Sequence, residues 1–211
     1  NIVDIIDSKT HPELSSDRII YIFKDDIDQI WILTWKGVYL CNPEKNIKKI
    51  TDEIFLYGAQ LKSGKIILSR YKPGGIWETS ETDNYQISKI ENISYHKDYS
   101  LLYESKSGLV YASEGYSRLV AFDPMNNFSI INNYDVKGEI SCIFEPPGDT
   151  LMFLATSYGF ARLNKEKKQA EIEGLPGPAI NSMVSDSKNR LWLSTNNGLA
   201  VLDSSYKKVA T

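Results

Sequence analysis

Six residues that are predicted to lie in loops have side chains suited to binding a small polar ligand. They are Trp35, Arg70, Tyr71, Tyr116, Tyr158 and Asn197. Aromatic rings can stack on the apolar faces of sugar rings, while guanidinium and amide groups supply hydrogen bonds, a mixture typical of small-molecule sites. We expect a ligand site where the fold brings these loops to one face. The alternative is that the aromatic rings pack against neighbouring loops or a partner domain.

Catalytic chemistry has weaker support in the sequence. Glu104, Glu139 and Glu145 are candidates for the acid and base of a glycoside hydrolase, although nothing in the sequence fixes their separation. No Ser-His-Asp order, reactive-cysteine signature or phosphate-binding glycine loop is present. The expectation is therefore a non-catalytic domain, with a five-bladed hydrolase as the less favoured alternative.

The residues that could bind metal lack the required spacing. The acidic run at residues 25–28 has neither the glycine nor the distal glutamate of a calcium loop, and it predicts a turn. His11 and His96 lie far apart, without the neighbouring ligands of a zinc site. The sequence thus predicts no metal and no cofactor.

Composition narrows the range of partners. With 24 basic and 27 acidic residues the net charge is -3, so no basic field favours nucleic acid, and residues 165–168 are a short solvated turn. No apolar run reaches the ~18 residues of a membrane span, so this region is not expected to contact the membrane. Cys41 and Cys142 fall in different repeats, where a disulfide is not expected.

The elements that must position the loops come from an internal repeat. An apolar strand followed by a turn and a glycine occurs five times, most clearly at residues 30–37, 151–159 and 191–198, and more weakly at 64–69 and 108–113. Aligned on Trp31 or its replacements, the copies are 36, 44, 42 and 39 residues apart. A period near 40 residues with strand-like units predicts an all-β propeller of about five four-stranded blades.

The repeat divides the chain into one domain of successive blades. The predicted blades are residues 14–52, 53–92, 93–135, 136–174 and 175–211, and residues 1–13 would be the outer strand of a preceding blade. Residues 207–211 are predicted to supply the last blade's own outer strand. Two arrangements stay open: a closed ring of five blades, and part of a larger, seven-bladed propeller.

Residues 180–199 resemble the two-component regulator propeller repeat, with an acidic turn, an apolar-Trp-apolar-x-Thr core and a Gly-Leu step. Residues 22–38 are similar, and residues 143–160 form a degenerate copy. In that family such repeats form the periplasmic sensor region of hybrid two-component system histidine kinases of gut Bacteroides-type bacteria.

The resemblance implies a sensor that recognises a glycan breakdown product. It also implies a periplasmic location, and contacts with other blades or domains of a parent sensor protein. A propeller that serves mainly for protein interaction or homodimerisation is the alternative function.

Overall fold

The computed structural model describes residues 6–14, 18–147, 151–176, 179–207 and 209 of the 211 in the chain. In this part the regular structure consists of β-strands and a short 3-10 turn, η1 (Pro124–Asn126), so the all-β prediction is confirmed. The chain forms two compact units, one of residues 1–104 and 124–129 and the other of residues 105–123 and 130–211. None of the described residues belongs to a helix long and apolar enough to cross a membrane.

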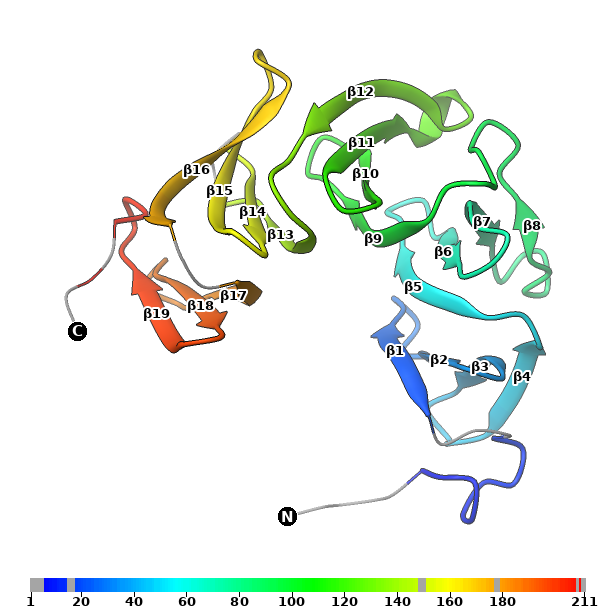
Figure 1. The fold of residues 1–211 in the computed structure, drawn as a ribbon. Helices are drawn as coiled ribbons and strands as arrows, with labels where there is room; N and C mark the ends of the chain where they lie inside the picture. Colours follow the sequence, from blue (N-terminus) through cyan, green and yellow to red (C-terminus); the bar gives the residue numbers. More distant parts are fainter. Residues whose placement is uncertain (1–5, 15–17, 148–150, 177–178, 208, 210–211) are drawn as a thin grey trace. The chain divides into compact units, whose positions relative to one another are not determined.

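The first unit contains two complete four-stranded antiparallel sheets, here called blades 1 and 2. Their strands are short and rich in β-branched and aromatic residues, which fit a pleated surface. Blade 1 comprises β1 (Ile19–Lys24), β2 (Ile30–Thr34), β3 (Gly37–Cys41) and β4 (Ile47–Thr51). Blade 2 comprises β5 (Phe55–Gln60), β6 (Ile66–Arg70), β7 (Ile76–Thr79) and β8 (Ser88–Lys89). Figure 1 shows the strands of each blade side by side in chain order.

The strands of the later repeats follow the same order along the chain. They are β9 (Tyr99–Glu104) in the first unit, then β10 (Val110–Glu114), β11 (Arg118–Asp123), β12 (Ser129–Asp135), β13 (Ile140–Phe144), β14 (Phe153–Thr156), β15 (Gly159–Asn164), β16 (Gln169–Pro176), β17 (Ile180–Ser185), β18 (Leu191–Thr195) and β19 (Gly198–Leu202). The strand β16 runs two residues past the boundary expected at residue 174. Of the outer strand expected at residues 1–13, residues 1–5 lie outside the described residues, and residues 6–13 form turns instead of a strand. The outer strand expected at residues 207–211 lies largely outside the described residues.

The first turn of blade 1 is held by one carboxylate. Asp25 Oδ1 accepts hydrogen bonds from the backbone N–H groups of Ile27 (3.2 Å) and Gln29 (2.8 Å). Its Oδ2 accepts one from the indole Nε1 of Trp31 at 3.0 Å. Because Trp31 is fully buried, its indole N–H needs an acceptor inside the protein. The acidic run therefore begins with a structural residue, which confirms the prediction of a turn.

The last repeat contains the same arrangement. Asp186 accepts hydrogen bonds from the backbone N–H groups of Lys188 and Arg190 at 2.9 and 3.0 Å. Its other oxygen accepts the Trp192 indole N–H at 2.8 Å and the Arg190 Nε–H at 2.7 Å. In the second and third repeats both residues of the pair are replaced, by Leu61 with Ile67 and by Ser105 with Tyr111. Carboxylate and indole are thus kept or lost together in these repeats.

A threonine holds the turn between the second and third strands of several repeats. The Thr34 hydroxyl donates to the carbonyl of Gly37 (3.0 Å) and accepts from the backbone N–H of Lys36 (3.0 Å). The same two kinds of bond are made at Thr156 with Gly159 and at Thr195 with Gly198. Gly37 has φ of 128°, and a Cβ there would lie 2.1 Å from the Thr51 carbonyl oxygen, so this turn requires glycine.

Blades 1 and 2 share one apolar cluster. Its buried members are Trp31, Leu33, Val38, Leu40, Phe55, Ile66 and Leu68. On the other face of blade 1, Leu14 packs against Ile32, Tyr39 and Cys41. Both faces of β2 are therefore covered, as the apolar run at residues 30–33 predicts.

The last repeat differs from blade 1 in how its faces are covered. One face of β17–β19 packs through Leu191 and Leu193 against Phe153 and Phe160 of the preceding repeat. The residues that point the other way are more open: Leu199 is 60% exposed and Val184 is 63% exposed. Trp192, equivalent to the fully buried Trp31, is half-buried.

Neighbouring repeats are also joined by a polar contact that recurs along the chain. In three repeats, the residue at or just after the end of the first strand (β5, β9 or β13) accepts a hydrogen bond from a backbone N–H in the first turn of the preceding repeat. The bonds are Asp26 N–H to Gln60 Oε1 (2.7 Å), Lys62 N–H to Glu104 Oε2 (2.7 Å) and Lys106 N–H to Glu145 Oε2 (2.7 Å). Each contact lies within one compact unit. These side chains satisfy N–H groups that the turns leave without a strand partner.

Candidate functional site

In blades 1 and 2 the connecting turns lie at the two opposite ends of the antiparallel strands. We call these two ends edges, each named after the connections that it carries. The turns at residues 25–29, 61–65 and 80–87 lie at one, which we call the turn edge. The loops at residues 35–36 and 71–75 lie at the other, the loop edge. Ligand-binding side chains are predicted at the loop edge.

At the loop edge, Trp35 from blade 1 contacts Tyr71 from blade 2. Their rings meet edge to face with centroids 5.3 Å apart. Both side chains are half-buried, and the guanidinium of Arg18 lies 5.0 Å from the centroid of the Trp35 ring. Two of the six predicted site residues are therefore adjacent. They form a partly exposed aromatic surface bordered by positive charge.

Arg70 lies next to this pair in the chain, and its guanidinium already has partners. Its Nη2 is 2.5 Å from Glu53 Oε1, and its Cζ is 4.7 Å from the centroid of the Trp77 ring. Its buried Nε has no hydrogen-bond partner among the described residues. The Lys72 ammonium lies 5.2 Å from the centroid of the Tyr71 ring. Basic side chains thus accompany the aromatic rings of this edge.

The other three predicted site residues belong to the second unit. Tyr116 is 77% exposed. Tyr158 is 52% exposed, with the Lys137 ammonium 5.0 Å from its ring centroid. Asn197 lies in an exposed turn, where its backbone N–H donates to the Thr195 hydroxyl (3.1 Å). Their participation in a site with Trp35 and Tyr71 stays a prediction.

Two of the three candidate catalytic glutamates have structural roles in the described part of the chain. Glu104 and Glu145 accept backbone N–H groups of the preceding repeat, as described above. Glu139 is exposed, and its own backbone N–H donates to the Ser157 hydroxyl at 3.1 Å. Among the described residues, no group of three or more His, Cys, Asp or Glu side chains could hold a metal ion.

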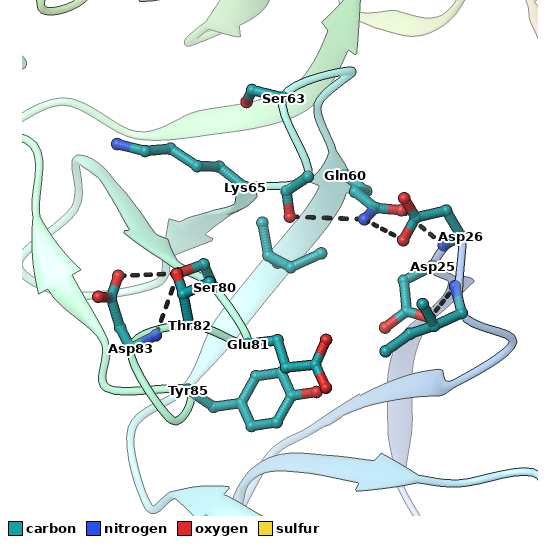
Figure 2. Close-up of a pocket in the computed structure, with 13 residues that line it drawn as sticks. Asp25, Asp26, Gln60, Ser63, Lys65, Ser80, Glu81, Thr82, Asp83 and Tyr85 are labelled. Atoms are coloured by element: carbon teal, nitrogen blue, oxygen red, sulfur yellow. Dashed lines mark hydrogen bonds between the residues drawn. The ribbon is translucent and has the colours of Figure 1, made fainter.

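The turn edge holds a pocket that sequence reasoning did not find. It has a volume of about 380 Å³ and is lined by Asp25, Asp26, Ile27, Gln60, Ser63, Gly64, Lys65, Ile66, Ser80, Glu81, Thr82, Asp83 and Tyr85. Figure 2 shows Gln60 reaching Asp26, with which it makes two hydrogen bonds of 2.7 and 2.6 Å. Three separate turns from two blades build this pocket. The only signal in the sequence was the acidic run at residues 25–28, which by itself predicts a turn.

Comparisons with known proteins bear on both the repeat and the fold. The family model described as "Two component regulator propeller" matches residues 174–197. No curated protein matches the chain. The extracellular domain of a proposed hybrid two component system from B. thetaiotaomicron is 17% identical with a TM-score of 0.71, over 92% of this chain and 28% of that chain.

Two further solved structures show the same fold. The extracellular domain of a proposed one component system from B. thetaiotaomicron is 19% identical with a TM-score of 0.70, over 94% of this chain and 29% of that chain. A catalytically inactive virginiamycin B lyase from Staphylococcus aureus, solved with quinupristin, is 12% identical with a TM-score of 0.73. That match covers 92% of this chain and 70% of the lyase.

These findings confirm the predicted fold class and the predicted repeat. The chain spans less than a third of the length of the two extracellular domains it is similar to. The fold is an all-β propeller with about five repeats, in which blades 1 and 2 are complete four-stranded sheets and the last repeat has three strands, β17–β19, among the described residues. The resemblance predicted for residues 180–199 is confirmed, because the two component regulator propeller model matches residues 174–197.

Proposed function

We propose that the chain is the ligand-sensing propeller of a two-component signalling protein, that it lies in the periplasm, and that it recognises a glycan fragment. The regulator propeller repeat at residues 174–197 supports this proposal. The likeness to extracellular domains of bacterial signalling systems agrees with it.

The observation that carries the proposal is the contact between Trp35 and Tyr71 at the loop edge. Two rings held edge to face by neighbouring blades offer a partly exposed, rigid surface to the apolar face of a sugar ring. Arg18 and Lys72 border these rings and can donate hydrogen bonds to sugar hydroxyl groups. Loops held by a rigid scaffold are a common location for binding residues.

We further propose that the chain is non-catalytic. Two of the three candidate glutamates, Glu104 and Glu145, accept backbone hydrogen bonds between repeats and are accounted for by the fold. The likeness to the virginiamycin B lyase concerns the fold, and a fold supports many functions.

A thermal-shift screen of the protein against defined oligosaccharides tests the proposal. A ligand at about 100 times its Kd stabilises the folded state by about 2.7 kcal/mol, so a true ligand must raise the Tm. We expect the shift to disappear in Trp35→Ala and to persist in Trp35→Phe, which keeps an aromatic face. Ile22→Ala, which changes an exposed residue of β1, is the matched control. A shift of unchanged size in Trp35→Ala would remove the loop edge from the proposal.

The interaction platform is the second candidate, because β17–β19 expose Val184 and Leu199 on one face. Exposed apolar side chains of this kind fit contact with another blade, another domain or a second copy. Sedimentation at increasing protein concentration discriminates the two functions. Association that is lost in Leu199→Lys, together with no response to any oligosaccharide, would favour the platform.

A further inference from the structure

We propose that the pocket at the turn edge of blades 1 and 2 binds a small organic cation that carries ammonium groups. This site is separate from the aromatic surface at the loop edge, and it does not depend on the proposed sensing of glycans.

The pocket has the size and construction of a small-molecule site. Its volume of about 380 Å³ lies within the range of ~300–1,000 Å³ typical of ligand pockets. The hydrogen bonds between Gln60 and Asp26 join a strand end of blade 2 to a turn of blade 1. The third wall, residues 80–85, is a turn held by the Ser80 hydroxyl, which donates to Asp83 Oδ2 at 2.8 Å. The cavity is therefore formed by fixed turns.

The charges around the cavity are strongly unequal. Its lining contains the four carboxylates of Asp25, Asp26, Glu81 and Asp83 and a single ammonium group, that of Lys65. The Lys65 ammonium is 2.8 Å from Glu78, a residue outside the lining. Figure 2 shows the Lys65 side chain directed away from Glu81 and Tyr85. The lining thus carries an excess of negative charge, which attracts a cation and repels an anionic ligand.

Three of these carboxylates have oxygens available to a ligand. Asp25 is 6% exposed, and its two oxygens already accept three hydrogen bonds. Asp26 and Asp83 are exposed, and each uses one oxygen for the bonds given above. Glu81 is exposed; its backbone carbonyl accepts the Asn84 N–H (2.9 Å), and its carboxylate makes no hydrogen bond or ion pair with the described residues. Asp26 lies on a turn of blade 1, and Glu81 and Asp83 share a turn of blade 2, so their free oxygens suit a ligand with more than one N–H donor.

The pocket also has an apolar part. Ile27, Ile66 and Tyr85 belong to the lining, and the Tyr85 hydroxyl donates to Gln29 at 2.7 Å, which fixes the ring. Burial, with a contribution from the Glu81 carboxylate, raises the pKa of Tyr85 above its usual value. A hydrocarbon stem between ammonium groups can lie against these side chains.

A bare metal ion fits this geometry poorly. The carboxylates surround the cavity, and no three of those described converge on a point that could hold a metal ion. An organic cation of several atoms can place its ammonium groups near separate carboxylates and its carbon atoms near Ile27 and Tyr85. Ligands of this kind are amines with a flexible or a cyclic carbon skeleton.

Isothermal titration calorimetry with 1,4-diaminobutane and with 1,4-butanediol tests the proposal, because the two probes share a carbon chain and differ in charge. We expect the diamine to bind and the diol to give no heat of binding. The diamine affinity should fall as ionic strength rises from about 0.01 M to about 1 M, since the Debye length shortens from ~30 Å to ~3 Å.

The double variant Glu81→Gln, Asp83→Asn identifies the site. It should weaken diamine binding about tenfold or more, a change of at least ~1.4 kcal/mol. Glu44→Gln, which neutralises an exposed carboxylate outside the pocket lining, should bind like the unaltered protein. An unchanged urea midpoint shows that each variant is folded.

Two results would overturn the proposal: equal binding of diamine and diol, or diamine binding that the double variant leaves unchanged. Trp35→Ala should keep its full affinity for the diamine. Loss of the oligosaccharide response in Trp35→Ala with diamine binding intact would show that the two sites are separate. A failed oligosaccharide screen would not affect the diamine result, and a failed diamine titration would not affect the oligosaccharide result.

Discussion

The two edges of blades 1 and 2 are built by the same strands and present different chemistry. At the turn edge, Asp25 holds its turn and the indole of the buried Trp31, and other carboxylates line a pocket. At the loop edge, Trp35 and Tyr71 remain half-buried, with Arg18 and Lys72 beside their rings. One edge is acidic and concave. The other is aromatic and basic.

The difference separates residues that identify the repeat from residues that can recognise a ligand. The acidic turn, the tryptophan and the threonine of the repeat make hydrogen bonds within their own blade. The same three residue types occur in the first and last repeats because both repeats make these local hydrogen bonds. The side chains at the loop edge make fewer such bonds and vary between repeats. Substitutions at the two edges should therefore affect different properties.

The largest effect is expected for Trp31→Ala. Removing a fully buried tryptophan from the cluster shared by blades 1 and 2 should lower the free energy of unfolding by about 3–5 kcal/mol. Trp192→Ala should cost less, because Trp192 is half-buried at the equivalent position. Urea denaturation of both variants measures the difference. Equal losses of unfolding free energy in the two variants would mean that burial against a neighbouring blade does not determine how much this tryptophan contributes to stability.

A smaller effect is expected for Glu145→Ala. The substitution removes the acceptor for the Lys106 backbone N–H and should cost about 1 kcal/mol. Glu104→Ala, which frees the Lys62 N–H, is the matched variant in the first unit. Urea denaturation should give similar losses for the two, with no change in the m-value. A loss near zero in both would mean that these contacts between repeats add no stability.

Acid should weaken the last repeat through Asp186. The indole N–H of Trp192, followed by the Arg190 groups, lowers the pKa of Asp186 well below its usual range. A lowered folded pKa gives stability that is present above the unfolded value of about 3.9 and is lost as pH falls through the folded value. Asp186→Asn should lack this part of the acid dependence. Identical pH profiles of stability for the two proteins would contradict the assignment.

The smallest effect on stability is expected at the loop edge. Trp35→Ala removes a partly exposed ring that contacts Tyr71, so it should cost about 1 kcal/mol, near the value of one aromatic pair. Thermal denaturation without ligand measures it. A loss as large as that of Trp31→Ala would show that Trp35 is a core residue.

The sequence alone was sufficient for features that depend on local pattern. The apolar run at residues 30–33 predicts a strand covered on both faces. The regular spacing of the five copies aligned on Trp31 predicts the repeat. The loop positions of Trp35 and Tyr71 follow from that same repeat. The pocket could not be predicted, because it requires Gln60 to reach Asp26 across two blades. The structural role of Glu145 likewise depends on a contact between repeats.

The indole N–H groups of the four tryptophans allow the most direct test of the contrast between the two edges. Hydrogen exchange followed by ¹H–¹⁵N NMR reports on each indole separately. We expect slow exchange for Trp31, which is buried and bonded to Asp25, and intermediate exchange for Trp192. We expect fast exchange for Trp35, whose indole makes no hydrogen bond with the described residues. Fast exchange at Trp31, or protection of Trp35 equal to that of Trp31, would contradict this contrast.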